Sequence, residues 1–189
     1  MQYHRAFRAI PRRSLIIPLA FALLVIGACR GKHSRTTVQN EEAPEGGPRI
    51  ASTFKVGDPA ATAQLLRGFY GLEGDGAWRW TAGSFAVLLR PPLTAAQHGA
   101  TVALSFSVPD VVIQKLGPVT LTASAGGTKL GSAKYTKPGA ATFSAEVPPE
   151  LLTKETITID FALDKSLPAG SIDQRELGVV ATSVSLESK

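Results

Sequence analysis

Cysteine and histidine are nearly absent from the sequence. Cys29 is the one cysteine among 189 residues, and only three residues are histidine. A single thiol excludes an intramolecular disulfide and a cysteine-based zinc or iron–sulfur site. Only His33 and His98 follow Cys29, too few for a multi-histidine metal site or a histidine-centred catalytic triad. We therefore expect no metal, no cofactor and no catalytic residue, and we expect His98, beside Gly99, to lie in a solvated turn.

Acidic residues are missing from the start of the chain, where Glu41 is the first. Four arginines precede an apolar run, from Leu15 to Ile26, that ends in Gly27-Ala28. The run is shorter than the roughly 20 residues that a membrane-spanning helix needs. A basic start, a short apolar run and small residues at its end are typical of a secretory signal peptide. We assign residues 1–28 to such a signal and favour the general secretory route over twin-arginine export, which Arg12-Arg13 only weakly suggests.

Cys29 directly follows this apolar run. Ile26-Gly27-Ala28-Cys29 resembles the lipobox of bacterial lipoproteins. The resemblance implies that the Cys29 thiol receives a diacylglycerol, that the signal is removed, and that acyl chains such as palmitate anchor the chain in a membrane. Each buried methylene of such a chain contributes about 0.8 kcal/mol. An ordinary signal peptide with an incidental cysteine is the alternative. Because Arg30 rather than an aspartate follows Cys29, the resemblance favours the outer over the inner membrane of the cell envelope.

A strong basic excess is also missing once the signal is set aside. The whole chain has 20 basic and 15 acidic residues, a net charge of +5. Four of the basic residues and none of the acidic ones lie in residues 1–28, so the remainder has 16 basic against 15 acidic residues. Nucleic-acid-binding domains normally keep a marked positive charge. The near-neutral remainder therefore argues against nucleic acid as a partner.

The part of the chain after the signal divides into a polar and an alternating segment. Residues 29–51 are rich in Gly, Pro, Glu and Thr without apolar periodicity, which predicts a lipidated cysteine followed by a flexible linker. Residues 52–189 are long enough for one domain. Within them apolar residues alternate with small or polar ones, the pattern of strands with one buried face. Six runs show this alternation: 84–89, 101–108, 119–124, 141–147, 157–163 and 180–186.

Turn-forming residues separate these runs. Gly126-Gly127 predicts a tight hairpin, and Pro138-Gly139 predicts a turn in which glycine has a positive φ. Pro148-Pro149 should end a strand, with one helical turn at 150–152, and the best other helical candidate is the short segment 60–66. Short strands with turns between them predict an all-β fold. We expect one antiparallel β-sandwich of the jelly-roll or galactose-binding-like type over residues 52–189, after a disordered N-terminal tether.

Two stretches, 68–80 and 164–178, break the strand pattern and carry a resemblance. Gly68-Phe69-Tyr70 with Glu73, then Trp78-Arg79-Trp80, then Asp173-Gln174-Arg175-Glu176-Leu177-Gly178 resemble the galactose-binding-like β-sandwich accessory domains of some bacterial membrane glycosyltransferases. The similarity spans roughly Leu65 to Glu187. It implies a β-sandwich near glycan chemistry and supplies no catalytic residue.

The same stretches hold the side-chain types of a sugar site. Aromatic faces stack on the apolar faces of pyranose rings, while charged groups hydrogen-bond hydroxyls in pairs. The candidate ligand-binding residues are Tyr70, Glu73, Trp78, Arg79, Trp80, Asp173, Arg175 and Glu176. The alternative interpretation is structural. The tryptophans would then belong to the core with Arg79 pointing outward, and Arg175 would hold the last loop by a salt bridge to Glu73 or Asp164. Both interpretations remain open from the sequence.

Three functions follow, in decreasing order of support. The first is a membrane-anchored, non-catalytic binding lipoprotein of the cell envelope with a glycan as ligand. The second is a structural or adaptor lipoprotein that binds another envelope protein through a sheet edge or loops. The third is a glycosidase that would use Glu73 with Asp173 or Glu176 as its two carboxylates. No enclosing architecture is indicated for the third, so we expect no enzymatic activity.

Overall fold

The computed structural model describes residues 49–189 of the chain. The predicted signal peptide, the lipobox with Cys29 and residues 29–48 of the predicted linker lie outside the described residues. Within the described part, no helix is both long and apolar enough to cross a membrane.

The described residues are mainly strands. Their bounds are β1 Thr53–Lys55, β2 Leu65–Glu73, β3 Trp78–Leu89, β4 Ala100–Val108, β5 Val119–Ala125, β6 Thr128–Tyr135, β7 Gly139–Val147, β8 Ile157–Leu163 and β9 Val180–Ser188. Two short α-helices, α1 Ala95–His98 and α2 Asp110–Leu116, and two 3₁₀ turns, Pro59–Gln64 and Pro149–Leu151, connect them. All six alternating runs of the sequence lie in strands, as predicted.

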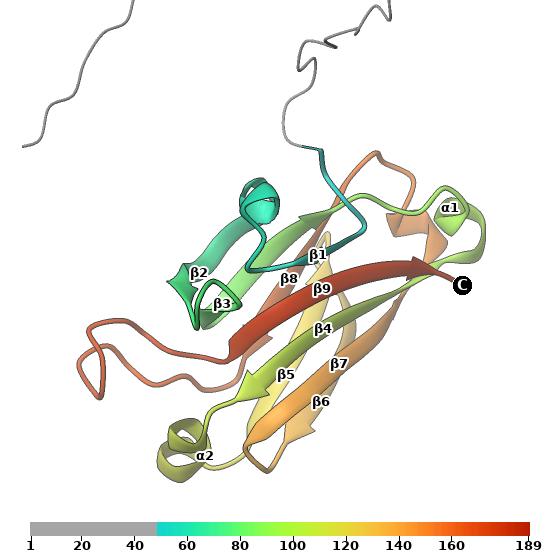
Figure 1. Cartoon of the computed structure of the whole chain (residues 1–189). Helices are drawn as coiled ribbons and strands as arrows, with labels where there is room; N and C mark the ends of the chain where they lie inside the picture. Colours follow the sequence, from blue (N-terminus) through green and yellow to red (C-terminus); the bar gives the residue numbers. More distant parts are fainter. Residues whose placement is uncertain (1–48) are drawn as a thin grey trace, which may run out of the picture. The chain divides into compact units, whose positions relative to one another are not determined.

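The strands pair antiparallel in the order β6-β5-β8-β3-β9-β4-β7, with β2 on β3 and β1 on β9. β3 joins two layers, because its second half pairs with β8 whereas Arg79 and Trp80 pair with β9. The layers face each other across aromatic contacts. The ring of Phe143 on β7 lies 6.1 Å from that of Phe161 on β8, and Phe106 on β4 lies 5.0 Å from Tyr135 on β6. The predicted all-β, antiparallel β-sandwich is confirmed (Figure 1).

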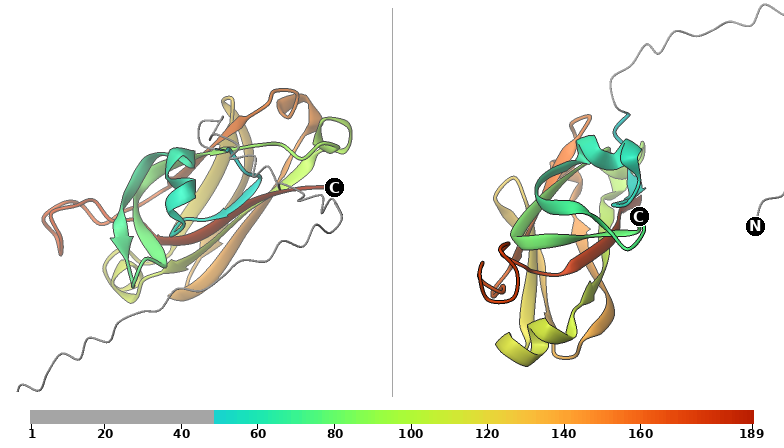
Figure 2. Two further views of the ribbon diagram at one scale, coloured as in Figure 1. Left: turned by 45° about the horizontal axis from the view of Figure 1, so that its top comes forward. Right: turned by 60° about the vertical axis from the view of Figure 1, so that its left-hand side comes forward.

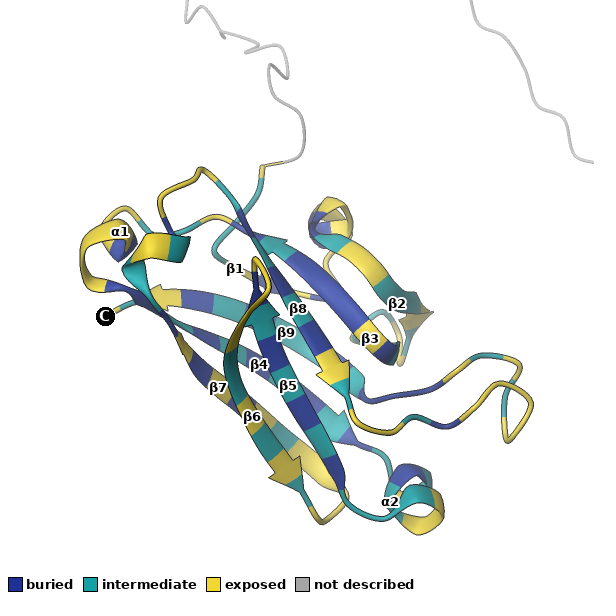
Figure 3. Ribbon diagram, turned by 180° about the vertical axis from the view of Figure 1, so that it is seen from behind, coloured by how far each residue is buried: buried dark blue, intermediate teal, exposed yellow. Residues whose placement is uncertain are grey.

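The core lies between these layers. Buried and less buried residues alternate along β4 and β5, as expected of strands with one inward face (Figure 3). Phe85 and Phe161 stack at 5.1 Å and are almost fully buried. Burial of large apolar side chains contributes about 25 cal/mol per Å² removed from water. Because the described residues include no cysteine, this core rather than a disulfide holds them together.

The turns agree largely with the prediction. Gly126 and Gly127 form the β5–β6 hairpin with φ of 55° and 83°, and Gly139 has a φ of 112° after Pro138. Two local predictions were wrong. The segment 60–66 is a 3₁₀ turn only to Gln64, and β2 begins at Leu65. The stretch 68–80, expected not to be plain strand, contains the end of β2 and the start of β3.

Two connections project from the strands on the same side of the domain. They are the β2–β3 hairpin and the long β8–β9 loop, which extends well beyond the strand ends (Figure 2). This arrangement places the two sequence stretches that broke the strand pattern next to each other.

Candidate functional site

The β2–β3 hairpin supplies the first half of the site. Gly74, Asp75 and Gly76 all have positive φ, at 58°, 54° and 85°, and they reverse the chain within a few residues. Such backbone is easy for glycine and tolerated by aspartate. The turn sets Glu73 directly opposite Trp78 in the register. Residues directly opposite in an antiparallel pair have adjacent side chains on one face, so the Glu73 carboxylate and the Trp78 indole are neighbours.

The β8–β9 loop supplies the second half. Its base is fixed by Leu167 and Leu177, which pair as an isolated bridge and are almost fully buried. Beyond it, the Gly178 amide donates to the Thr81 carbonyl at 2.7 Å, and the Val179 amide donates to Thr81 Oγ1 at 3.2 Å. These contacts join the loop to β3 and direct its middle toward the hairpin.

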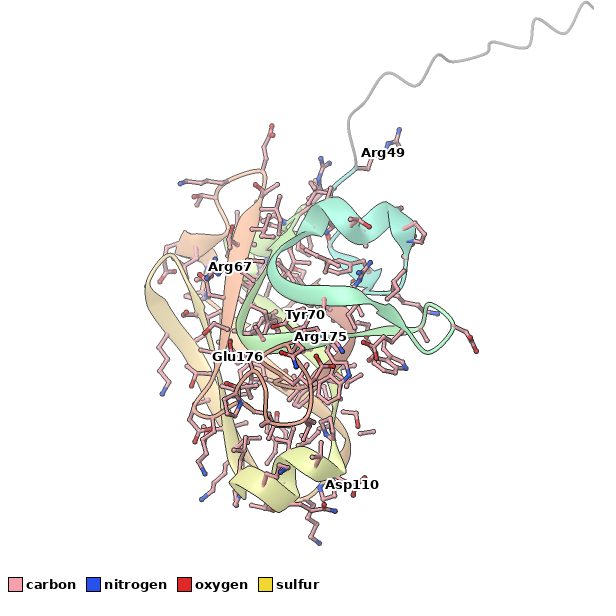
Figure 4. The ribbon with its side chains drawn as sticks, turned by 90° about the vertical axis from the view of Figure 1, so that its left-hand side faces the viewer. Arg49, Arg67, Tyr70, Asp110, Arg175 and Glu176 are labelled. Atoms are coloured by element: carbon pink, nitrogen blue, oxygen red, sulfur yellow. The ribbon has the colours of Figure 1, made fainter. Side chains whose placement is uncertain are left out.

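Arg175 connects the two halves. Its Nε and Nη2 donate to Asp173 Oδ1 and Oδ2 at 3.0 and 2.8 Å, and its Nη1 donates to Glu73 Oε1 at 2.9 Å. The guanidinium carbon also lies 5.1 Å from the centre of the Tyr70 ring, a cation–π arrangement. All three charged side chains remain about one-third exposed. Figure 4 shows Arg175 beside Tyr70.

The electrostatics of this group follow from the shared guanidinium. Hydrogen bonds from the Arg175 side chain and amide lower the pKa of Asp173 to about 2. The side-chain hydrogen bonds to Asp173 and Glu73 raise the pKa of Arg175. Asp173 and Arg175 are therefore charged at neutral pH, and the carboxylates of Asp173 and Glu73 both contact one guanidinium.

Tyr70, Glu73, Trp78, Asp173 and Arg175 are called the Arg175 cluster below. Tyr70 and Trp78 are both half-buried. The Trp78 indole lies over Gly74, where a Cβ would come within 2.0 Å of Nε1. The cluster is thus a partly exposed surface with aromatic and charged groups side by side, which can accept hydroxyl groups and apolar ring faces together.

The other three candidate residues lie apart from the cluster in their contacts. Arg79 donates to the carbonyls of Val56 and Tyr70 at 3.0 and 2.9 Å, so its guanidinium holds main chain rather than facing outward. Trp80 is half-buried and packs against the core. Glu176 Oε1 accepts from the Gly83 amide at 3.2 Å and from the Ser166 hydroxyl, which ties the loop to β3.

Two of the carboxylates proposed for hydrolysis, Glu73 and Asp173, contact the same guanidinium, that of Arg175. A glycosidase needs one carboxylic acid whose pKa is raised so that it can protonate the leaving group. The pKa of Asp173 is shifted in the opposite direction, and both Asp173 and Glu73 are paired with Arg175.

Among residues 49–189, no group of three or more His, Cys, Asp or Glu side chains is placed to bind a metal ion. His98 is exposed at the end of α1.

Sequence reasoning missed Gly83 and Ser166 as hydrogen-bond partners of Glu176. An isolated glycine within a strand pattern indicates a close approach of another group. Gly83 shows such an approach, because a Cβ there would come within 2.6 Å of Glu176 Oε1 and 2.8 Å of Ser166 Oγ. This glycine was therefore a readable signal for where the loop attaches.

No family model matches the chain, and no curated protein matches it. Among solved structures, it is similar to the GH115 4-O-methyl-α-glucuronidase BtGH115A, with specificity for decorated arabinogalactans (TM-score 0.45, 10% identity, 76% of this chain covered). The chain spans only 18% of that enzyme.

Two carbohydrate-binding modules are also similar. CsCBM6-3 from Clostridium stercorarium, in complex with cellobiose, has a TM-score of 0.41 at 13% identity, with 76% of this chain and 99% of that chain covered. CBM36, in complex with calcium and xylotriose, has a TM-score of 0.40 at 14% identity, with 71% and 98% covered. At these values the likeness is one of coarse architecture, and no ligand or residue role is transferred from these proteins to this chain.

Proposed function

We propose that this protein is a non-catalytic binding lipoprotein of the cell envelope, that Cys29 anchors it to a membrane, preferably the outer one, and that its ligand is a glycan. The observation that carries the glycan part is the Arg175 cluster. In it a guanidinium held by two carboxylates lies over the half-buried ring of Tyr70, and one of these carboxylates, Glu73, is opposite the half-buried Trp78 in the strand register.

The chemistry of the cluster suits a sugar. A guanidinium has five N–H donors, and the contacts to Asp173 and Glu73 engage three of them. The remaining donors and the free carboxylate lone pairs suit adjacent hydroxyls, which both donate and accept. Tyr70 and Trp78 offer apolar faces for a pyranose ring. Because the charged groups already hold one another, little side-chain ordering remains when a ligand binds.

The charge of the cluster selects among glycans. Glu73 and Asp173 outnumber Arg175, and the exposed Asp75 on the hairpin turn adds a further negative charge. Like charges brought together at a site lower affinity. We therefore expect neutral glycans to bind in preference to acidic ones such as uronic-acid polymers.

A glycan array followed by titration calorimetry tests this proposal. Arg175→Lys keeps the positive charge but loses the planar fork, so affinity for the bound neutral glycan should fall by about tenfold or more. Trp78→Ala should weaken binding similarly. The control is Arg67→Lys, which changes an arginine that is also ion-paired, to Asp160, but lies outside the cluster. If Arg175→Lys binds the glycan with the affinity of the unmodified protein, the Arg175 cluster is not the glycan-binding site.

A second function is favoured by a separate observation. Leu72 and Ile172, the neighbours of Glu73 and Asp173 in the sequence, are 41% and 47% exposed. Exposed large apolar residues beside charged ones are typical of protein interfaces. An adaptor lipoprotein would use them to bind another envelope protein. Crosslinking in membranes would then recover one dominant partner, and Leu72→Ser with Ile172→Ser would lose it while glycan binding stayed unchanged.

A further inference from the structure

The described chain begins with a segment that one buried side chain holds. Gln64 is only 2% exposed. Its Oε1 accepts from the Ala51 amide at 3.0 Å, and its Nε2 donates to the carbonyls of Ala51 at 3.0 Å and of Leu88 at 2.8 Å. We call these contacts the Gln64 clasp. Hydrogen bonds of a buried amide are directional, and breaking them leaves buried polar groups unpaired, which is costly. The clasp therefore fixes the place where the N-terminal segment joins the sandwich.

The same place carries the most exposed large apolar side chain among the described residues. The Arg90 amide donates to the Ala51 carbonyl at 3.1 Å, and the Ser52 hydroxyl donates to the Arg90 carbonyl at 2.7 Å. Leu93 follows three residues later, after Pro91-Pro92, and is fully exposed at 102%. Consecutive prolines restrict the backbone, so the loop presents Leu93 outward from a stiff base.

We propose that this end of the sandwich rests on the surface of a lipid bilayer, with Leu93 in the interface between headgroups and acyl chains. The proposal depends on the lipid anchor at Cys29 in the proposed function and is independent of the glycan.

The anchor makes such a weak contact effective. One leucine buries too little apolar area to hold a free domain on a bilayer. If the roughly 20-residue segment before Arg49 is the flexible linker that its composition predicts, its ends lie about 25 Å apart on average. A tether of that length raises the effective concentration of the domain at the surface to about the millimolar range. The clasp then decides which end of the domain meets the surface first.

The charged side chains at this end of the sandwich add only a little attraction to an anionic membrane surface. Arg49 and Arg90 flank the junction, and Lys154 lines a shared groove with Arg90 and Leu93. A basic group near an anionic leaflet is attracted to it, but each contributes little by itself. Glu155 lines the same groove and Glu150 lies in the preceding turn, so the basic excess is small. Leu93 is therefore the main determinant of the contact.

The Arg175 cluster lies away from this end. Figure 4 shows Arg49 at one end of the domain and Asp110 at the other, with Tyr70 and Arg175 well below Arg49. With the Leu93 end on the membrane, the cluster stays open to ligands in the aqueous space, which suits an anchored binding protein.

Site-specific labelling of the full chain tests the contact. If Cys29 is acylated as proposed, its sulfur is in a thioether, and the sequence has no other cysteine that could react with the label. Leu93→Cys and, as the matched control, Ile172→Cys on the β8–β9 loop are labelled with the fluorophore NBD. Both are reconstituted on vesicles of phosphatidylethanolamine and phosphatidylglycerol. We expect the label at position 93 to emit at shorter wavelength and to be reduced by aqueous dithionite several-fold more slowly than the label at position 172.

Three outcomes decide the proposal. Equal dithionite rates at positions 93 and 172 would overturn it, and so would equal protection of position 93 when Cys29→Ser removes the acyl chains. Protection that needs Cys29 and is confined to position 93 would support it. Glycan binding is measured in parallel on Leu93→Ser, which should bind as the unmodified protein does. An absence of glycan binding in both proteins would therefore count against the ligand and leave the membrane contact standing.

Discussion

Two side chains of opposite character hold chain segments against this sandwich. Gln64, neutral and 2% exposed, holds the segment at Ala51 through three hydrogen bonds to main-chain groups. Arg175, charged and 31% exposed, holds the β8–β9 loop to the β2–β3 hairpin through two carboxylates. The side chain of the Gln64 clasp is buried and its partners are main-chain groups. The charged side chains of the Arg175 cluster are partly exposed to solvent and bond mainly to one another.

The difference in burial between the Gln64 clasp and the Arg175 cluster indicates which of them serves stability and which serves binding. A buried amide has no water to replace its partners, so breaking the clasp leaves unsatisfied groups. Exposed ion pairs are screened, and water competes for their donors and acceptors. Groups that already exchange with water can exchange with ligand hydroxyls at little cost. We therefore assign the clasp to the stability of the fold and the cluster to ligand exchange.

Gln64→Leu should have the largest effect on stability. The leucine has similar size but leaves the Ala51 amide and the Leu88 carbonyl without their partner. Each unsatisfied buried group costs about 1–3 kcal/mol, so the loss of both partners should lower the free energy of unfolding by about 2–6 kcal/mol. Urea unfolding followed by the fluorescence of Trp78 and Trp80 measures it. The control Gln114→Leu changes an exposed glutamine and should stay within about 0.5 kcal/mol. A loss no larger for Gln64→Leu than for Gln114→Leu would break the comparison.

Gly83→Ala should have a smaller effect, confined to the loop. The added Cβ would meet the ends of the Glu176 and Ser166 side chains, and these flexible groups can move aside. The Glu176 carboxylate should then leave the residue 83 amide, and hydrogen exchange should speed up there and across residues 166–177. Gly71→Ala is the control, because a Cβ at Gly71 meets nothing within 4 Å. If exchange in the loop is unchanged by Gly83→Ala, the contacts of Glu176 do not hold the loop.

Most of the fold could be predicted from the sequence because its strands alternate regularly. β4 and β5 bury every second residue, so their faces were visible as a period of two. The hairpin of β2 and β3 was missed because its glycines interrupt the alternation. Gly68, for example, has a φ of 73°, and a Cβ there would come within 2.2 Å of the Ser84 carbonyl oxygen. A close backbone approach of this kind removes the side-chain pattern on which the prediction depends.

The candidate site could be predicted only in part. Composition indicated the aromatic and charged residues of the two stretches, and Arg175 does form the salt bridge to Glu73 that one interpretation expected. Pattern alone could not show that Arg79 holds the carbonyls of Val56 and Tyr70. Nor could it find Gln64, because its partners are main-chain groups far apart in the sequence and carry no side-chain signal. Hydrogen bonds from side chains to main-chain groups leave no trace in the pattern of residue types, so the sequence alone did not predict them.

The titration of Asp173 gives the most local test of the comparison. Arg175 lowers its pKa from 3.8 to about 2, so the carboxylate should stay ionised throughout the range from pH 4 to 7. A lowered pKa means that the contribution to stability is present above 3.8 and is lost as the pH falls through about 2. Arg175→Gln should return the midpoint toward 3.8, measured from the carboxyl carbon shift by NMR, while Arg67→Gln should leave it unchanged. The overall stability between pH 4 and 7 should hardly respond to Arg175→Gln, because the pair is exposed to solvent, and the neutral Gln64 clasp does not titrate at all. An Asp173 midpoint near 3.8 in the unmodified protein would mean that Arg175 is not held in solution and that the cluster is not prepared for a ligand.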